Sequence, residues 1–205
     1  MQPITTLSGI AAPLPQPNLD TDVIMPKRFL KTVTREGLAQ GAFADLRFAP
    51  DGAELPDFAL NRPEWRGAAI LVVGDNFGCG SSREHAVWGL MQLGIRALIG
   101  TGFAGIFFDN CRRNGLLAIR LDPAARDALL ARAADPARNR FAIDLPAQEI
   151  RAVGETWDFP IEAARKADLI SGADAIVQTL RHAADIRAFE AAARQSRPWC
   201  AVAVG

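Results

Sequence analysis

The chain has 205 residues, 49% of them hydrophobic, which is enough to bury one sizeable core with at most a small subdomain. Lysine plus arginine and aspartate plus glutamate total 23 each, so the net charge gives no bias toward nucleic acid or an anionic membrane. No apolar run approaches the roughly 20 residues of a membrane-spanning helix, and residues 1–6 lack the pattern of a secretory signal. We therefore expect a cytoplasmic protein that binds neither nucleic acid nor membranes.

The first informative segment, residues 18–31, reads NLDTDVIMPKRFLK. Its two aspartates, Asp20 and Asp22, could suggest a divalent cation, but a turn in which they bond to their own backbone is more common. Residues 23–25 predict a short extended piece that ends at Pro26. Farther along, residues 49–67 are rich in proline, glycine, aspartate and asparagine, which predicts a surface loop.

The loop at residues 74–85, GDNFGCGSSREH, joins a predicted buried strand at 68–73 to a predicted helix at 86–93. It brings two hydroxyls and a guanidinium to a helix N-terminus, where free N–H groups favour negative charge. Such a place can hold a carboxylate or stabilise an alkoxide. In a purely structural alternative, Ser81-x-x-Glu84 is a capping box. That alternative leaves the second serine, the arginine and the glycines unexplained.

Two nucleotide-binding motifs can be excluded for this loop. The pair of glycines in Gly78-Cys79-Gly80 is followed three residues later by Arg83, where the dinucleotide fingerprint requires glycine. A phosphate-binding P-loop that began at Gly74 would need glycine at position 79, where this chain has Cys79. It would also need Lys-Ser or Lys-Thr directly afterwards, and this pair is absent there.

The remainder of the chain alternates between strand and helix patterns. A strand at 97–99 after the helix at 86–93 completes a β-α-β unit, which implies parallel pairing. Later segments predict helices at 103–113 and 123–134, a strand at 116–121, antiparallel strands at 141–145, 149–153 and 156–159, and helix from 161 onward. The sequence therefore predicts an α/β fold with parallel and antiparallel strands.

The cysteines and histidines do not form a metal-binding pattern. Cys79, Cys111 and Cys200 are 32 and 89 residues apart, whereas cluster sites usually contain closely spaced cysteines. The two histidines, His85 and His182, are also far apart. We expect reduced thiols and no metal held by this chain.

The exact string NFGCGSSREH at residues 76–85 resembles the signature of the swivelling domain of the aconitase superfamily. The nearest likeness is to the family of small subunits of bacterial 3-isopropylmalate dehydratase. Further likenesses follow in order along nearly the whole chain, at residues 18–31, at 103–110 with 114–117, and at 172–176 with 179–180. The resemblance implies one swivelling β/β/α three-layer domain over residues 1–205, with a helical C-terminal segment from about residue 161.

The resemblance also implies a function. Members of the family act as hydro-lyases in leucine biosynthesis, a branched-chain amino-acid pathway, and interconvert 2-isopropylmalate and 3-isopropylmalate by dehydration and rehydration. The chain is expected to be active only in a heterodimer with a large subunit that carries a [4Fe–4S] cluster, and to bind a small dicarboxylic hydroxy acid. By the motif match Ser81 is the catalytic base, and Ser82 and Arg83 bind substrate.

Other residues are placed less directly by the resemblance. Asp20, Thr21 and Asp22 are expected to border the site. In aconitase an arginine after that motif binds a second carboxylate, but here no residue aligns with it. Arg28, Lys31 and Arg35 are candidates, and Lys31 is our choice.

Two other functions stay open at this point. One is a sister hydro-lyase that acts on another alkylmalate or on homoaconitate, because residues around Ser81 handle the part that these substrates share. The other is a non-catalytic module whose helix N-terminus merely holds an anion.

Overall fold

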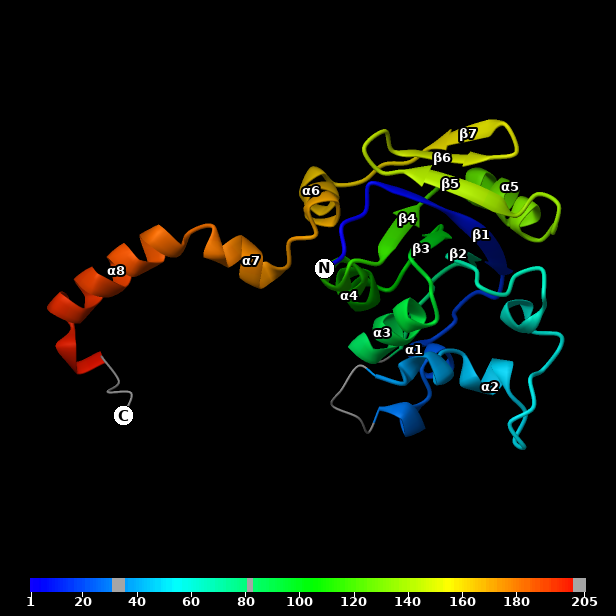
Figure 1. Cartoon of the computed structure of the whole chain (residues 1–205), viewed down its shortest axis with the longest axis horizontal. Helices are drawn as coiled ribbons and strands as arrows, with labels where there is room; N and C mark the ends of the chain where they lie inside the picture. The colour runs from blue at the N-terminus through cyan, green and yellow to red at the C-terminus, as the bar shows by residue number, and fades with distance from the viewer. Residues whose placement is uncertain (31–35, 81–82, 201–205) are drawn as a thin grey trace. The chain divides into compact units, whose positions relative to one another are not determined.

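The sheet at the centre of the fold contains parallel and antiparallel strands. This computed structural model describes residues 1–30, 36–80 and 83–200. The strands are β1 (Thr6–Leu14), β2 (Ile70–Val73), β3 (Ala97–Gly100), β4 (Leu117–Arg120), β5 (Arg140–Asp144), β6 (Glu149–Ala152) and β7 (Glu155–Asp158). They are hydrogen-bonded in the order β4-β3-β2-β1-β5-β6-β7 (Figure 1). Strand β1 is parallel to β2 and antiparallel to β5, so it joins the two halves of the sheet.

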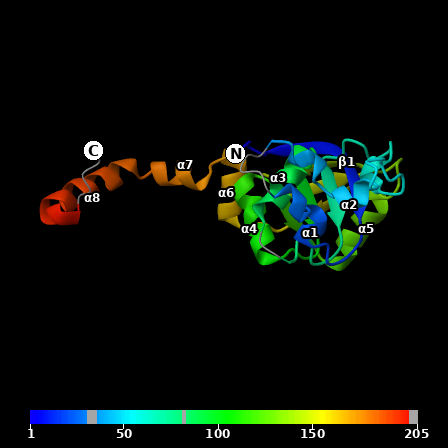
Figure 2. The ribbon, with the colours of Figure 1, turned by 90° about the horizontal axis from the view of Figure 1, so that it is seen from below.

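Helices cover the parallel strands on both faces. The helical segments are α1 (Thr21–Ile24), η1 (Lys27–Phe29), η2 (Leu38–Gln40), α2 (Ala44–Arg47), η3 (Ala59–Asn61), α3 (Glu84–Gln92), α4 (Gly105–Asn114), α5 (Pro123–Ala133), α6 (Ala163–Ser171), α7 (Ala175–Leu180), α8 (Ala183–Ser196) and η4 (Pro198–Cys200). In Figure 2, helices α1, α3 and α4 face the viewer.

Alternate residues of β2 show how the sheet separates two apolar clusters. Leu71 and Val73 pack in a cluster with residues of α1, α3 and α4, whereas Ile70 and Val72 pack with residues of α5 and α6. All residues of β2 and β3 are buried, as expected for parallel strands covered on both faces. The predicted α/β fold with both strand directions is confirmed.

The structure corrects the sequence analysis at three places in the N-terminal third of the chain. Residues 23–25 were predicted to be extended, but Val23 and Ile24 belong to α1 because the Asp20 carboxylate caps this turn. The loop at 49–67 is not wholly at the surface, since Asn61 and Trp65 are buried. Strand β1 was not predicted.

Contacts within the chain define two units, residues 1–172 and residues 173–205. The C-terminal helical segment predicted from about residue 161 begins in the structure at Ala163. Gly172, in the left-handed conformation, ends α6 at the close of the first unit. In the ranges that the structure describes, no helix has the length and apolar character needed to cross a bilayer.

Candidate functional site

The two motifs predicted from the sequence lie side by side. The backbone N–H of Asn18 donates to the carbonyl of Asp75 (2.8 Å), Gly78 N–H donates to Leu19 (2.7 Å), and Thr21 N–H donates to Cys79 (2.8 Å). The two segments follow the carboxyl ends of β1 and β2, which are adjacent and parallel. Loops at this edge of parallel strands are where α/β proteins commonly bind ligands.

Glycines allow the loop after β2 to take this path. Gly78 and Gly80 have φ angles of +76° and +86°, a region that favours glycine. A Cβ atom on Gly78 would lie 2.2 Å from the ring of Phe107 in α4. The loop therefore packs against the first turn of α4 only because a side chain is missing there.

The Gly78→Ala variant is expected to lower the free energy of unfolding, measured by urea denaturation. Gly52→Ala is the matched control because Gly52 has a similar φ of +87° and no atom within 4 Å of the Cβ that alanine would add. The control should cost about 1–2 kcal/mol from backbone strain alone. Gly78→Ala should cost about 1–3 kcal/mol more because the methyl group overlaps Phe107. Equal losses for the two variants would contradict the close contact.

Residues 20–22 are placed by α1. The Asp20 carboxylate accepts a hydrogen bond from Val23 N–H (2.7 Å), so Asp20 is the N-cap and stabilises the helix directly. This confirms the predicted bond between Asp20 and its own backbone. Thr21 is buried, and Asp22 forms an ion pair with Arg83. Lys27 lies 3.8 Å from the same carboxylate group of Asp22.

Arg83 connects the two motifs electrostatically. It is the N-cap residue of α3, and its side chain is only 14% exposed. The Asp22 carboxylate offsets the cost of burying the guanidinium charge. An anionic ligand can bind to this guanidinium through N–H groups that Asp22 leaves unused, because the fork carries five donors.

A small cavity of about 120 Å³ lies between these groups. Its lining comes from both motifs and from the start of α4: Thr21, Gly78, Gly80, Arg83, Ala104, Gly105, Ile106 and Phe107. Ala104, the N-cap of α4, has an apolar side chain that cannot accept a hydrogen bond from the first N–H groups, and the start of α4 brings the positive end of the helix dipole to this cavity. No sequence motif predicted this contribution of α4. The sequence signal for it was Gly105, which begins a helix just after parallel strand β3. The segments that follow parallel strands gather at one edge of the sheet.

The position of Glu84 at the start of α3 does not match the one that a capping box requires. In that alternative Ser81 caps the helix and Glu84 is its third residue, but α3 begins at Glu84 itself. The Glu84 carboxylate instead accepts a hydrogen bond from the Asn114 side chain of α4 (2.7 Å). Asn114 in turn accepts one from Trp88 Nε1 (2.8 Å). Glu84 therefore ties the start of α3 to the end of α4.

Three of the predicted site residues, Lys31, Ser81 and Ser82, lie outside the described residues. Among the predicted site residues that the structure describes, Thr21 and Arg83 line the small cavity. Asp22 is ion-paired with Arg83. Asp20 supports α1. Arg28, a candidate for a second carboxylate, is paired with Asp45 (2.5 Å).

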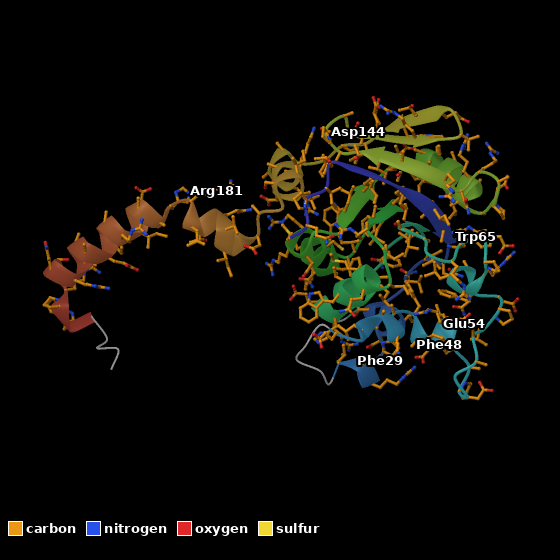
Figure 3. All side chains as sticks on the ribbon, in the orientation of Figure 1. Phe29, Phe48, Glu54, Trp65, Asp144 and Arg181 are labelled. Carbon is orange, nitrogen blue, oxygen red and sulfur yellow. The ribbon has the colours of Figure 1, made fainter. Side chains whose placement is uncertain are left out.

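A larger, open cavity of about 800 Å³ lies elsewhere, between Phe29 and Phe48 (Figure 3). Arg28 and Asp45 line it, and their charges neutralise each other. The smaller cavity is the candidate site, because both sequence motifs and the segments that follow parallel strands β1, β2 and β3 line it.

The thiols of Cys79 and Cys111 differ in how deeply they are buried. Cys79 is half-buried, and its Sγ donates a hydrogen bond to the carbonyl of Asn18 (3.4 Å). Cys111 is fully buried in α4, and desolvation raises the pKa of its thiol far above the ordinary value. Among the residues that the structure describes, no group of three or more histidines, cysteines or carboxylates could hold a metal ion. The described thiols and carboxylates therefore do not fit an iron–sulfur cluster.

Comparison with known proteins identifies the family. Residues 1–124 match the family model of the aconitase C-terminal domain, and residues 176–202 match that of the C-terminal domain of the 3-isopropylmalate dehydratase small subunit. A 3-isopropylmalate dehydratase small subunit from Jannaschia sp. is 52% identical over 97% of this chain and 100% of its own length. A 3-isopropylmalate dehydratase small subunit 2 from Salmonella typhimurium is 51% identical over 97% of this chain and 96% of its own length.

The fold agrees with that of a solved relative. A crystal structure of a 3-isopropylmalate dehydratase from Methanocaldococcus jannaschii superposes with a TM-score of 0.63 and 25% identity, over 90% of this chain and 99% of that one. The swivelling α/β fold implied by the sequence motifs is thereby confirmed. The chain belongs to the family of 3-isopropylmalate dehydratase small subunits.

Proposed function

We propose that this chain is the small subunit of a hydro-lyase that interconverts 2-isopropylmalate and 3-isopropylmalate in leucine biosynthesis. The observation that carries the proposal is whole-length identity of about one half to proteins named as small subunits of 3-isopropylmalate dehydratase. The cavity beside Arg83, at the ends of β1 and β2, supports it. A cytoplasmic location fits this biosynthetic role.

The reaction requires a base strong enough to remove a proton from carbon beside a carboxylate. Dehydration breaks that C–H bond and a neighbouring C–O bond: the C–H electron pair forms the double bond, the proton passes to the base, and the hydroxyl leaves as hydroxide with the C–O electron pair, so the proton and the hydroxide together are the water removed. Rehydration then adds hydrogen and hydroxyl to the opposite carbons. We assign the proton transfer to the Ser81 oxygen, which accepts the proton in dehydration and returns it in rehydration.

A serine hydroxyl is ordinarily far too weak an acid to ionise at neutral pH. Stabilisation of its anion must come from positive charge and N–H groups that are already in place. Arg83 follows Ser81 by two residues, and the first turn of α3 begins at Glu84. Each tenfold gain in rate requires about 1.4 kcal/mol, so these groups must act together.

Substrate binding is assigned to residues of both motifs. Arg83 is proposed to bind one substrate carboxylate, and Ser82 to donate a hydrogen bond to it. Thr21 borders the cavity, and Asp22 holds Arg83 in place. Asp20 caps α1, the helix that carries Thr21 and Asp22. Lys31 remains the proposed partner of the second carboxylate.

This chain is proposed to supply half of the active site. The described residues do not fit a cluster, so we assign the [4Fe–4S] cluster to a large subunit that completes the enzyme as a heterodimer. A sister enzyme for another alkylmalate or homoaconitate would use the same Ser81 and Arg83. Turnover across a panel of alkylmalates separates these substrates.

The half-site proposal predicts that the isolated chain is inactive and colourless. Addition of a reconstituted large subunit should produce the ultraviolet absorbance of the unsaturated intermediate. Each subunit alone, at the same concentration, is the control. Turnover by this chain alone would overturn the half-site proposal, and binding of an anion without turnover in the complex would favour the non-catalytic module.

A further inference from the structure

The second unit of the chain exposes large apolar side chains. Within α7, α8 and η4, each side chain that the structure describes is exposed or half-exposed. The most exposed large apolar residues are Ile176 (71%), Leu180 (62%), Phe189 (69%) and Trp199 (79%). Figure 3 shows the side chains standing out from α7 and α8, with Arg181 at the joint between the two helices.

These apolar residues follow helical spacing. Ile176 and Leu180 are four residues apart in α7, so they lie on one side of that helix. In α8, Ile186, Phe189 and Ala193 recur at intervals of three and four, which again defines one side. We call these five residues the apolar face of the second unit.

Helices of this length need support from a partner. Helix α7 has 6 residues and α8 has 14, and isolated helices shorter than about 12–15 residues are marginal in water. A helix in a folded protein is stabilised chiefly by packing of its apolar side, and here that side is exposed. The pattern is typical of an amphipathic helix that docks in a hydrophobic groove.

The family matches set the second unit apart from the domain that is shared with aconitase. The aconitase C-terminal domain model covers residues 1–124, whereas the second unit is matched by a separate model named for the dehydratase small subunit, at residues 176–202. A domain that is the C-terminal part of aconitase is thus a separate subunit in this family. A separate subunit must be held to the rest of its enzyme by non-covalent contacts.

We infer that the apolar face of the second unit docks in an apolar groove on the large subunit and anchors the two subunits together. The inference rests on the proposed function, which requires that subunit. On α8, Glu190 lies three residues after Arg187 and four before Arg194, so this side of the helix carries both signs of charge.

The test is the affinity of the full-length chain for the large subunit, measured by titration calorimetry. The variant Leu180→Ser/Phe189→Ser removes one large apolar side chain from each helix. Its control is Gln178→Ser/Gln195→Ser, because these residues lie on the opposite sides of α7 and α8 by helix geometry. The apolar variant should bind at least about a hundredfold more weakly, and the control should bind like the wild type.

Three further measurements separate this inference from its rivals. Turnover at saturating concentrations of the apolar variant should return to the wild-type value, because the reacting groups lie in the first unit. The melting temperature and sedimentation of the isolated chain should not change. Unchanged affinity for the large subunit overturns the inference. A lowered melting temperature with affinity retained would mean that the face covers its own chain, and a loss of dimers would mean that it binds a second copy.

Failure of the proposed function gives a different result. In that case the wild-type chain itself would not bind the large subunit, and both ideas would fall. Equal weakening by the apolar variant and by the glutamine control would overturn the docking inference alone.

Discussion

Replacement of Ser81 by alanine is expected to lower the turnover of the reconstituted enzyme by about two to four orders of magnitude. That range is typical of the loss of a positioned general base. Alanine keeps the backbone and removes only the oxygen that accepts the proton, so the affinity for substrate should change little. The measurement is the steady-state rate, followed by absorbance of the unsaturated intermediate.

The control for this variant is Ser8→Ala, an exposed serine in β1. It should have wild-type turnover. Stability is the discriminating second measurement, because a serine that only supported a helix would contribute about 1 kcal/mol to unfolding and little to catalysis. Near-normal turnover of Ser81→Ala together with a weakened fold would refute its assignment as the base.

The fold was predictable wherever local patterns agree with long-range packing. The strand at 68–73 and the helices at 103–113 and 123–134 have clear apolar patterns, and the structure contains them with small shifts at their ends. Strand β1 lacks such a pattern because Gly9, Pro13 and three alanines or serines dilute it. Its strand conformation is fixed by pairing with β2 on one side and β5 on the other.

Gly9 illustrates how a tertiary contact can determine a residue that looks like a strand breaker. A Cβ atom at this position would lie 2.9 Å from the Cβ of Ala69. The glycine allows β1 to approach the residue just before β2. Such a requirement depends on a neighbour 60 positions away, so a reading of the local sequence cannot identify it.

The short helix α1 was not predicted because the local propensity of its residues opposes the structure that they adopt. Val23 and Ile24 favour extended structure by propensity, but the Asp20 cap and burial of Ile24 in the main core favour a turn of helix. The candidate site shows the same limit. Its two motifs were predicted separately, whereas the pairing of Asp22 with Arg83 depends on the backbone hydrogen bonds between the two loops.

Replacement of Arg83 by lysine is expected to lower kcat/KM by about 10- to 100-fold, the effect of losing a charge-assisted hydrogen bond. Lysine keeps the positive charge beside Asp22 but loses the planar fork that binds a carboxylate through two parallel bonds. Because Arg83 is proposed both to bind substrate and to stabilise the Ser81 anion, KM should rise and kcat should fall. Steady-state kinetics with each isomer as substrate measure the two constants separately.

Arg66→Lys is the matched control, since Arg66 forms an exposed ion pair with Glu54 (2.6 Å) and lines neither described cavity. A surface pair of this kind contributes about 0–1 kcal/mol to stability, so the control should show wild-type kinetics and nearly wild-type unfolding. A rise in KM alone would limit Arg83 to binding the carboxylate. If both constants stayed at wild-type values in Arg83→Lys, the guanidinium would serve only to hold Asp22, and another cation would have to receive the substrate.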